Sequence, residues 1–237
     1  MNDTLPPANP VEAWYRYPDL AKAQSDGVFC YYIQRRMSCV ISIYCHAKGM
    51  SPNTATLIDA VFAVFAAIAF YFQYFILAVL FIQLFGIWSC VDGELARLSG
   101  KASALGDFYD TMVDRVSEFI IVVGILFSFD KVQPTLVWQL LLFAYIGAIF
   151  LITNSSEKYR SAYHRNYPKR RVEPLFCWLC AGSDIRFLHL SIAILWFSAT
   201  GNSALLFWLI VLMTVTLYIN FLLRLWKVSQ LDQSISP

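Results

Sequence analysis

Three aspartates lie close together in the sequence, at positions where they can act jointly. Asp110 and Asp114 are four residues apart, so on a helix they share one face. A short polar loop at 98–105 brings Asp92, at the end of the preceding helix, next to them. Carboxylates that converge near a bilayer repel one another, and a cation is the usual relief. Oxygen ligands without His or Cys select Mg²⁺, Mn²⁺ or Ca²⁺ rather than zinc, which predicts metal-assisted phosphoryl chemistry.

A purely structural interpretation of these acids is also open. Carboxylates at helix ends often pair with nearby cations, and Arg97, Lys101 and Arg115 lie within reach in the sequence. On this interpretation the acids stabilise helix ends and hold no metal.

The elements that must position the acids are long apolar segments. Of the 237 residues, 58% are hydrophobic and only 14% are charged, whereas soluble domains carry about a quarter charged residues. We therefore expect an all-α integral membrane protein, because lipid offers the backbone no hydrogen-bond partner outside a helix. The net charge of +2 gives no indication of a nucleic-acid partner.

Apolar segments of spanning length predict six transmembrane helices after an N-terminal amphipathic helix. The stretch 28–47 alternates apolar and basic residues, so it suits a helix in the membrane interface or one packed on other protein. We divide the chain into an N-terminal lead and interfacial helix at 1–50, a six-helix transmembrane domain at 51–228 and a tail at 229–237. The six spans are expected at about 54–72, 75–88 (continuing as a helix to 98), 106–129, 134–153, 187–199 and 204–223. A long basic loop is expected at 155–171.

The basic residues fall on one side of this six-span arrangement. That side holds both termini, the loop at 98–105 and the segment 155–171, whereas the opposite side holds Lys131 alone. The positive-inside rule then puts the acids and both termini in the cytoplasm. The basic side includes Arg16, Lys22, Arg35, Arg36, Lys48, Arg97, Lys101, Lys158, Arg160, Arg165, Lys169, Arg170, Arg171, Arg186, Arg224 and Lys227.

The stretch around the acids resembles the signature of the CDP-alcohol phosphotransferase family, Asp-x2-Asp-Gly-x2-Ala-Arg-x8-Gly-x3-Asp-x3-Asp. Seven of its eight fixed positions match, and the family's first Asp falls on Ser89. Ser51-Pro52-Asn53-x2-Thr56 also looks like the family's entry to the first span, and Asp26-Gly27 with Arg35-Arg36 is similar to members with inositol-phosphate acceptors. The matching residues are Asp92, Gly93, Ala96, Arg97, Gly106, Asp110 and Asp114.

The resemblance implies a role for each matched residue. Asp92, Asp110 and Asp114, with Ser89 as a neutral and poorer ligand, would bind Mg²⁺ or Mn²⁺. Asp114 would be the base that takes the proton from the acceptor hydroxyl. The resemblance also implies a homodimer, although no GxxxG pattern marks a face for it. The CDP-binding set would be Asp92, Gly93, Ala96, Arg97 and Gly106.

The implied activity is transfer of a substituted phosphate from a CDP-alcohol, such as CDP-diacylglycerol, to a hydroxyl acceptor, with release of CMP, in phospholipid synthesis. A phosphorylated acceptor would suit the cytoplasmic cations, although these also serve as a topology signal and lipid anchor. Ser89 supports an alternative, a catalytically weakened member that acts as a binding or scaffold subunit. A small transporter would instead spread its acids through the bilayer centre. The candidate acceptor-binding residues are Arg115, Lys158, Arg160, Arg170 and Arg171.

Overall fold

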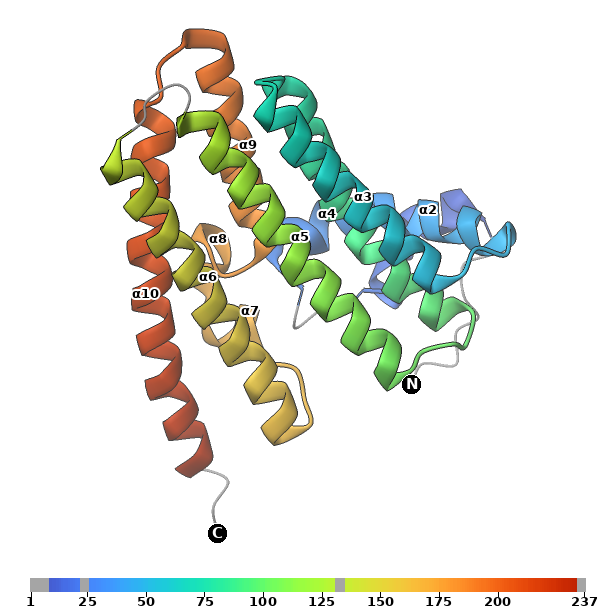
Figure 1. Cartoon of the computed structure of the whole chain (residues 1–237). Helices are drawn as coiled ribbons and strands as arrows, with labels where there is room; N and C mark the ends of the chain where they lie inside the picture. The colour runs from blue at the N-terminus through green and yellow to red at the C-terminus, as the bar shows by residue number, and fades with distance from the viewer. Residues whose placement is uncertain (1–8, 22–25, 131–134, 234–237) are drawn as a thin grey trace.

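The computed structural model describes residues 9–21, 26–130 and 135–233, and these residues form helices and connecting turns without strands (Figure 1). Part of the N-terminal lead, Lys22, Lys131 and the end of the C-terminal tail lie outside the described residues. The short elements are α1 (Pro10–Tyr15), η1 (Tyr17–Asp19), η2 (Cys30–Gln34), α7 (Lys169–Val172) and α8 (Pro174–Leu179). The longer helices are α2 (Arg35–Ala47), α3 (Pro52–Tyr71), α4 (Phe75–Leu98), α5 (Ala104–Asp130), α6 (Leu136–Tyr163), α9 (Ser183–Thr200) and α10 (Ala204–Gln233).

Six of the long helices, α3, α4, α5, α6, α9 and α10, form the body of the molecule and alternate in direction along the chain (Figure 1). Within the described residues, α3, α4, α6 and α10 are long and apolar enough to cross a membrane. The helix α5 lies outside this set and carries the charged residues Asp107, Asp110, Asp114, Arg115 and Glu118. On length and composition alone, the structure therefore supports four of the six predicted membrane spans.

Local signals explain most helix ends. Ser51 caps α3 through a hydrogen bond from Thr54 N–H to its hydroxyl (3.2 Å), and Pro52 occupies the first turn, where a missing N–H costs nothing. Gly201 ends α9 in the left-handed conformation (φ 71°), which glycine adopts without strain. The helix α6, however, continues to Tyr163, so the prediction that 155–163 belong to a loop was wrong. Loss of hydrophobicity does not end a helix, because Lys, Arg and Glu are good helix formers.

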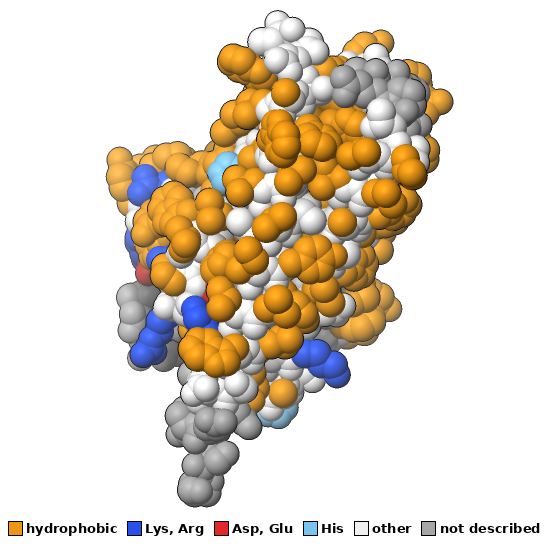
Figure 2. All heavy atoms as spheres, turned by 90° about the vertical axis from the view of Figure 1, so that its left-hand side faces the viewer, with side chains coloured by type: hydrophobic (Ala, Val, Ile, Leu, Met, Phe, Trp, Pro, Cys, Tyr) orange, Lys and Arg blue, Asp and Glu red, His pale blue; other side chains and the backbone are white. Residues whose placement is uncertain are grey.

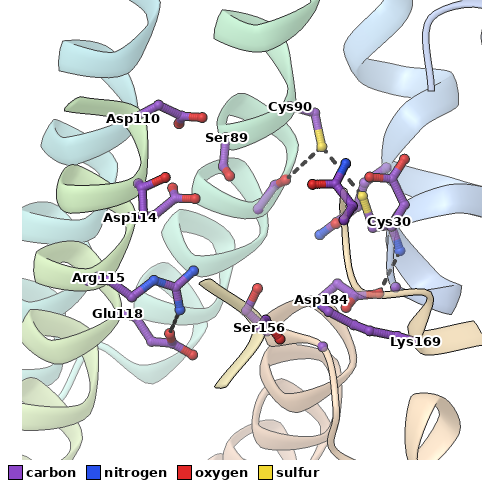
Figure 3. Close-up of a pocket in the computed structure, with 18 of the residues that line it drawn as sticks. Cys30, Ser89, Cys90, Asp110, Asp114, Arg115, Glu118, Ser156, Lys169 and Asp184 are labelled. Carbon is purple, nitrogen blue, oxygen red and sulfur yellow. Dashed lines mark hydrogen bonds and ion pairs between the residues drawn. The ribbon is translucent and has the colours of Figure 1, made fainter. Parts of the chain in front are cut away.

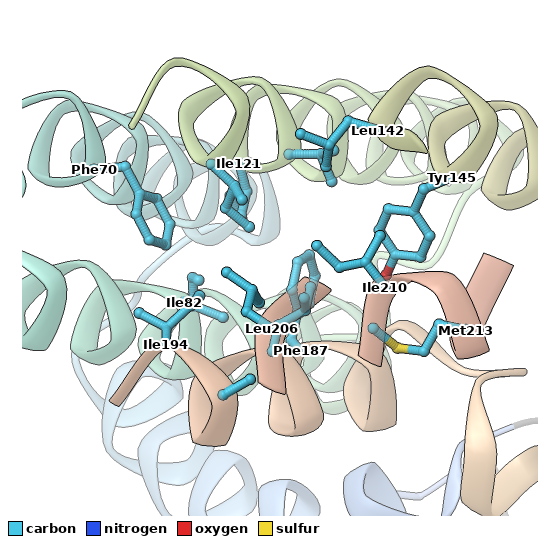
Figure 4. Packing of buried hydrophobic residues seen from close by; sticks show 14 of the residues in the cluster. Phe70, Ile82, Ile121, Leu142, Tyr145, Phe187, Ile194, Leu206, Ile210 and Met213 are labelled. Atoms are coloured by element: carbon cyan, nitrogen blue, oxygen red, sulfur yellow. The ribbon is translucent and has the colours of Figure 1, made fainter. Parts of the chain in front are cut away.

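The main hydrophobic core lies toward the end of the bundle away from the acids, and it brings together side chains of α3, α4, α5, α6, α9 and α10 (Figure 4). On one side α3 packs against α4 and α5, on the other α6 packs against α10, and α9 packs against both α4 and α10. Gly124 allows α5 to pack tightly against α3, because a Cβ there would lie 2.7 Å from Ala67 Cα. Apolar side chains also cover most of the face shown in Figure 2, and Lys and Arg lie mainly toward its lower part. Such a surface suits lipid better than water.

The segment predicted as an interfacial helix packs its polar face against α4. Arg35 donates to Glu94 (2.8 Å) and forms a buried ion pair with Asp26 (2.9 Å). Ser38 and Ser42 also donate to Glu94, at 2.8 Å and 2.7 Å. The structure therefore shows the contact with protein that the sequence left open, while placement in the membrane interface stays a prediction.

Candidate functional site

Three helices bring the signature residues to one end of the bundle. Asp92 lies six residues before the end of α4, and Asp110 lies six residues after the start of α5. At 1.5 Å per residue, both are about 9 Å inside their helix ends. Ser89 and Asp114 lie about one turn deeper on the same two helices. The side chains therefore form two layers, with Asp92 and Asp110 in the outer layer and Ser89 and Asp114 in the inner one.

The members of each layer lie close together. In the outer layer Thr56 of α3 donates its hydroxyl to Asp92 Oδ2 (2.8 Å), and the Asp92 and Asp110 side chains lie within interaction range of each other. In the inner layer the Ser89 side chain lies beside the Asp114 carboxylate. Figure 3 shows Ser89 pointing from α4 toward Asp114 on α5, with Asp110 on the next turn. Asp92 is buried, and Asp110 and Asp114 are half-buried.

A cavity of about 440 Å³, which we call the α3–α4–α5 cavity, opens beside the outer layer. The chain from Ser51 to Thr56 forms part of its wall, and Arg97 and Lys101 supply positive charge. Gly93 and Gly106 also line it, and the absence of side chains there leaves room for a ligand to approach the backbone. All five residues predicted to bind CDP, namely Asp92, Gly93, Ala96, Arg97 and Gly106, line this cavity.

A second cavity of about 240 Å³, which we call the central cavity, lies on the other side of the acids. Its wall comes mainly from η2, α4, α5, α6 and the start of α9, with Lys169 of α7. Ser89 and Asp114 line the central cavity alone, whereas Asp107 and Asp110 line both cavities. The aspartates therefore lie at the boundary between the two cavities, which differ in the residues that line them.

Both basic and acidic side chains line the central cavity. Arg115 donates to Glu118 (2.8 Å), as Figure 3 shows, and Arg160 donates to Asp107 (3.1 Å). Lys169 also lines the wall. Burial lowers the pKa of Lys169, and the positive charge of Arg224 lowers it further. A negatively charged ligand in this cavity would stabilise the charged form of Lys169.

The predicted acceptor-binding residues separate into two groups. Arg115 and Arg160 line the central cavity. Lys158 is exposed and lines a groove of about 1190 Å³ between α5 and α6 instead. Arg170 stacks over the ring of Tyr31 (4.3 Å to its centroid), and Arg171 is exposed outside the central cavity wall. The geometry thus brings together two of the five residues.

Sequence reasoning missed other residues of the site. Lys169 stands in the run Lys169-Arg170-Arg171, where no periodicity distinguishes the residue that faces inward. Glu118 and Asp184 also line the central cavity, and only the i, i+4 spacing from Asp114 marks Glu118 in the sequence. Asp59 of α3 is a further buried acid near the signature, and the spacing of one turn from Thr56 was its only signal.

The donor set fits a hard divalent cation. Carboxylate and hydroxyl oxygens, which Mg²⁺ and Mn²⁺ prefer, come from Ser89 and Asp92 on α4 and from Asp110 and Asp114 on α5. A buried carboxylate oxygen, Asp59 Oδ1, has no hydrogen-bond partner, as expected beside a cation site. Among the described residues no group of three His, Cys, Asp or Glu side chains is arranged to hold a metal ion. Such an ion would therefore depend on oxygens from a substrate to complete its shell.

Comparison with known proteins decides the family. The family model for CDP-alcohol phosphatidyltransferase matches residues 49–216, which include the signature and both cavities' main walls. The chain belongs to this family. Membership and the four apolar helices together make this CDP-alcohol phosphatidyltransferase relative an integral membrane protein.

Curated relatives of this family member come from archaea and bacteria. The bifunctional IPC transferase and DIPP synthase of Archaeoglobus fulgidus is 32% identical over 142 residues, which cover 60% of this chain and 27% of the relative. The archaetidylinositol phosphate synthase of Pyrococcus horikoshii is 38% identical over 77 residues, which cover 32% of this chain and 41% of the relative. The chain therefore spans less than half the length of these relatives.

The fold also matches a solved structure. The crystal structure of Mycobacterium tuberculosis phosphatidylinositol phosphate synthase with CDP-DAG bound superposes with a TM-score of 0.64 at 16% sequence identity. The match covers 80% of this chain and 92% of the mycobacterial one. At this identity the likeness establishes the shared fold.

Proposed function

We propose that the protein transfers a substituted phosphate from a CDP-alcohol to a hydroxyl acceptor and releases CMP, as a step of phospholipid synthesis. One observation carries the proposal: Asp110 lines two cavities, one walled by the CDP signature and one lined by cations. A donor in the α3–α4–α5 cavity and an acceptor in the central cavity would meet at the aspartates.

The chain's own residues divide the work of this reaction. Arg97, beside Gly93 in the α3–α4–α5 cavity, would neutralise phosphate charge on the donor. Asp114 would take the proton from the acceptor hydroxyl in the central cavity. The acceptor oxygen then bonds to the phosphorus that carries the donor's alcohol, and the bond from that phosphorus to CMP breaks. Mg²⁺ or Mn²⁺ held by Asp92, Asp110, Asp114 and Ser89 would neutralise the pyrophosphate charge that develops.

The substrates follow from the cavities and the relatives' names. CDP-diacylglycerol is the proposed donor, because the mycobacterial structure contains CDP-DAG. Arg115, Arg160 and Lys169 favour a phosphorylated acceptor, and inositol phosphate is the first choice, since relatives are named archaetidylinositol phosphate synthase and phosphatidylinositol phosphate synthase. Guanidinium and ammonium groups in a partly enclosed cavity suit a phosphate monoester.

The proposed membrane arrangement has six spans and a cytoplasmic site. The alternating directions of α3, α4, α5, α6, α9 and α10 support six spans, and the basic residues at the end that holds the acids support a cytoplasmic orientation (Figure 1). Both termini would then be cytoplasmic, with η2 and α2 at the membrane interface. A homodimer in the bilayer completes the proposal, and crosslinking in native membranes that gives only monomer would contradict it.

The test is direct. Purified protein in lipid nanodiscs is incubated with radiolabelled CDP-diacylglycerol, Mg²⁺ or Mn²⁺, and either inositol phosphate, glycerol phosphate or inositol. We expect CMP release that depends on metal and on a phosphorylated acceptor. A second candidate, the scaffold subunit, is favoured by Ser89 alone. Binding of CDP-diacylglycerol without CMP release under every acceptor would support the scaffold and overturn the transferase.

A further inference from the structure

A buried acid outside the signature lies beside the candidate metal site. Asp59 of α3 is 1% exposed, and its Oδ1 atom has no hydrogen-bond partner. Burying a carboxylate without a partner costs several kcal/mol, roughly, unless something compensates for its charge. No ion pair of the described residues includes Asp59: Arg115 and Arg160, which line the central cavity, pair with Glu118 and Asp107.

Contacts on both sides fix where Asp59 lies against α4. The two helices are antiparallel: Thr56 is hydrogen-bonded to Asp92, and two turns along, Phe62 meets Trp88 with ring centroids 5.8 Å apart. Asp59 is midway between Thr56 and Phe62 on the same face of α3. It therefore faces the stretch of α4 midway between Trp88 and Asp92, at the level of Ser89 and Cys90.

The contact between α3 and α5 places Asp59 at the same depth in the bundle. These helices are parallel, and they meet at Ala67 and Gly124, where a Cβ on Gly124 would lie 2.7 Å from Ala67 Cα. Moving eight residues back along each helix leads from Ala67 to Asp59 and from Gly124 to residue 116, within one turn of Asp114. In agreement, Asp59 lies within electrostatic range of Asp114, Asp92 and Asp110.

We propose that Asp59 is a fourth carboxylate of the metal site, supplying from α3 the negative charge that Ser89 does not supply from α4. This inference rests on the proposed function, because it assumes a divalent cation among Asp92, Asp110 and Asp114. A carboxyl group buried among three other acids either keeps its proton or shares a cation with them, and the proposal is that a divalent cation takes the place of that proton. The site then has four carboxylates on three helices. Its total negative charge therefore stays the same even though Ser89 replaces the family's first Asp.

The experiment measures Mn²⁺ binding by calorimetry on the full chain in nanodiscs, with CDP present. Asp59→Asn keeps the shape of the side chain and removes its charge. We expect Mn²⁺ to bind at least about tenfold more weakly, the lower end of what is lost when a group that orients metal ligands is removed. The Mn²⁺-dependent rise in Tm should shrink with it. Asp19→Asn, an exposed acid paired with Arg16, is the matched control and should bind Mn²⁺ as the wild type does.

A double variant that moves the carboxylate from α3 to α4 distinguishes the loss of a metal ligand from the loss of the fold. Asp59→Ser should lose Mn²⁺ affinity, and adding Ser89→Asp should restore it, because Ser89 already contacts Asp114 across the same layer. A double variant that binds no better than Asp59→Ser, or an Asp59→Asn variant with wild-type affinity, overturns the role of Asp59 alone. If the wild type binds no Mn²⁺ with CDP present, the proposed function fails as well.

Discussion

At the scale of single residues, the outer and inner layers of the site predict different defects. Asp114→Asn removes the proposed proton acceptor, which lines the central cavity and not the α3–α4–α5 cavity, so turnover should fall by at least about a hundredfold while CDP binding stays near normal. Asp92→Asn alters the outer layer and the hydrogen bond from Thr56, so metal and CDP binding should weaken together. Measuring kcat and the Kd for CDP in parallel distinguishes the two. Near-normal turnover in Asp114→Asn would contradict its role as the base.

The cations of the basic segment give a second residue-scale prediction, with a matched control. Lys169 lines the central cavity, whereas Lys158 is exposed in the groove between α5 and α6. Loss of a hydrogen bond to a charged group costs about 1.5–3 kcal/mol, so Lys169→Ala should raise the KM for a phosphorylated acceptor roughly 10–100-fold. Lys158→Ala should leave it unchanged. Equal effects in both variants would show that the segment acts through its overall charge.

The signature predicts most of the candidate site from sequence, because its residues have fixed spacings on two consecutive helices. Asp92 and Asp110 line one cavity and Asp110 and Asp114 the other, and the roles of the three acids stay predictions. Asp59 and Lys169 belong to segments whose facing direction depends on tertiary contacts, such as the one between Ala67 and Gly124. Sequence spacing alone contains no information about those contacts.

At the scale of elements, one arginine ties three segments together. Arg224 of α10 forms a buried ion pair with Glu173 (2.6 Å) and donates to Ile152 O (2.8 Å) and Ser156 Oγ (2.7 Å) of α6. Tyr167 and Asn220 also donate to Glu173, at 2.8 Å and 3.1 Å. This network fixes the connection between α6 and α9, which carries Lys169 to the central cavity.

This network predicts a stability effect with a defined pH dependence. Burial alone would raise the pKa of Glu173, but its hydrogen bonds and ion pair with Arg224 outweigh that and lower it. A lowered folded pKa contributes stability above the unfolded pKa of about 4.3, and the contribution is lost as pH falls further. Glu173→Gln leaves Arg224 buried without its counter-charge and should cost about 3–5 kcal/mol at pH 7. Thermal unfolding at pH 7 and pH 4 should show a smaller difference between variant and wild type at the lower pH.

Helix boundaries show what a hydrophobicity pattern predicts well. The bounds of α3 and α4 matched the expected ones closely, since Ser51, Pro52 and the turn before Phe75 are local signals. The helices α6 and α10 instead run about ten residues past their apolar stretches, to Tyr163 and Gln233. Membrane thickness limits the apolar stretch, whereas the helix itself continues while its residues favour one.

At the scale of the whole molecule, orientation in the membrane is open to a simple test. Single cysteines at positions 2, 131 and 236, which lie outside the described residues, are introduced after the six native thiols are replaced. Six spans predict that positions 2 and 236 react from the cytoplasmic side and position 131 from the other. Labelling of 2 and 236 from opposite sides would rule out an even number of spans.

The two cavities that meet at Asp110 also constrain the order and stereochemistry of events. If the donor occupies the α3–α4–α5 cavity and the acceptor the central cavity, as proposed, neither has to leave before the other arrives, and initial rates should fit a sequential mechanism rather than a ping-pong one. In that arrangement the acceptor oxygen would approach the phosphorus from the side opposite the departing CMP. One such displacement inverts the configuration at phosphorus, so a donor made chiral there by sulfur should yield a product of opposite hand.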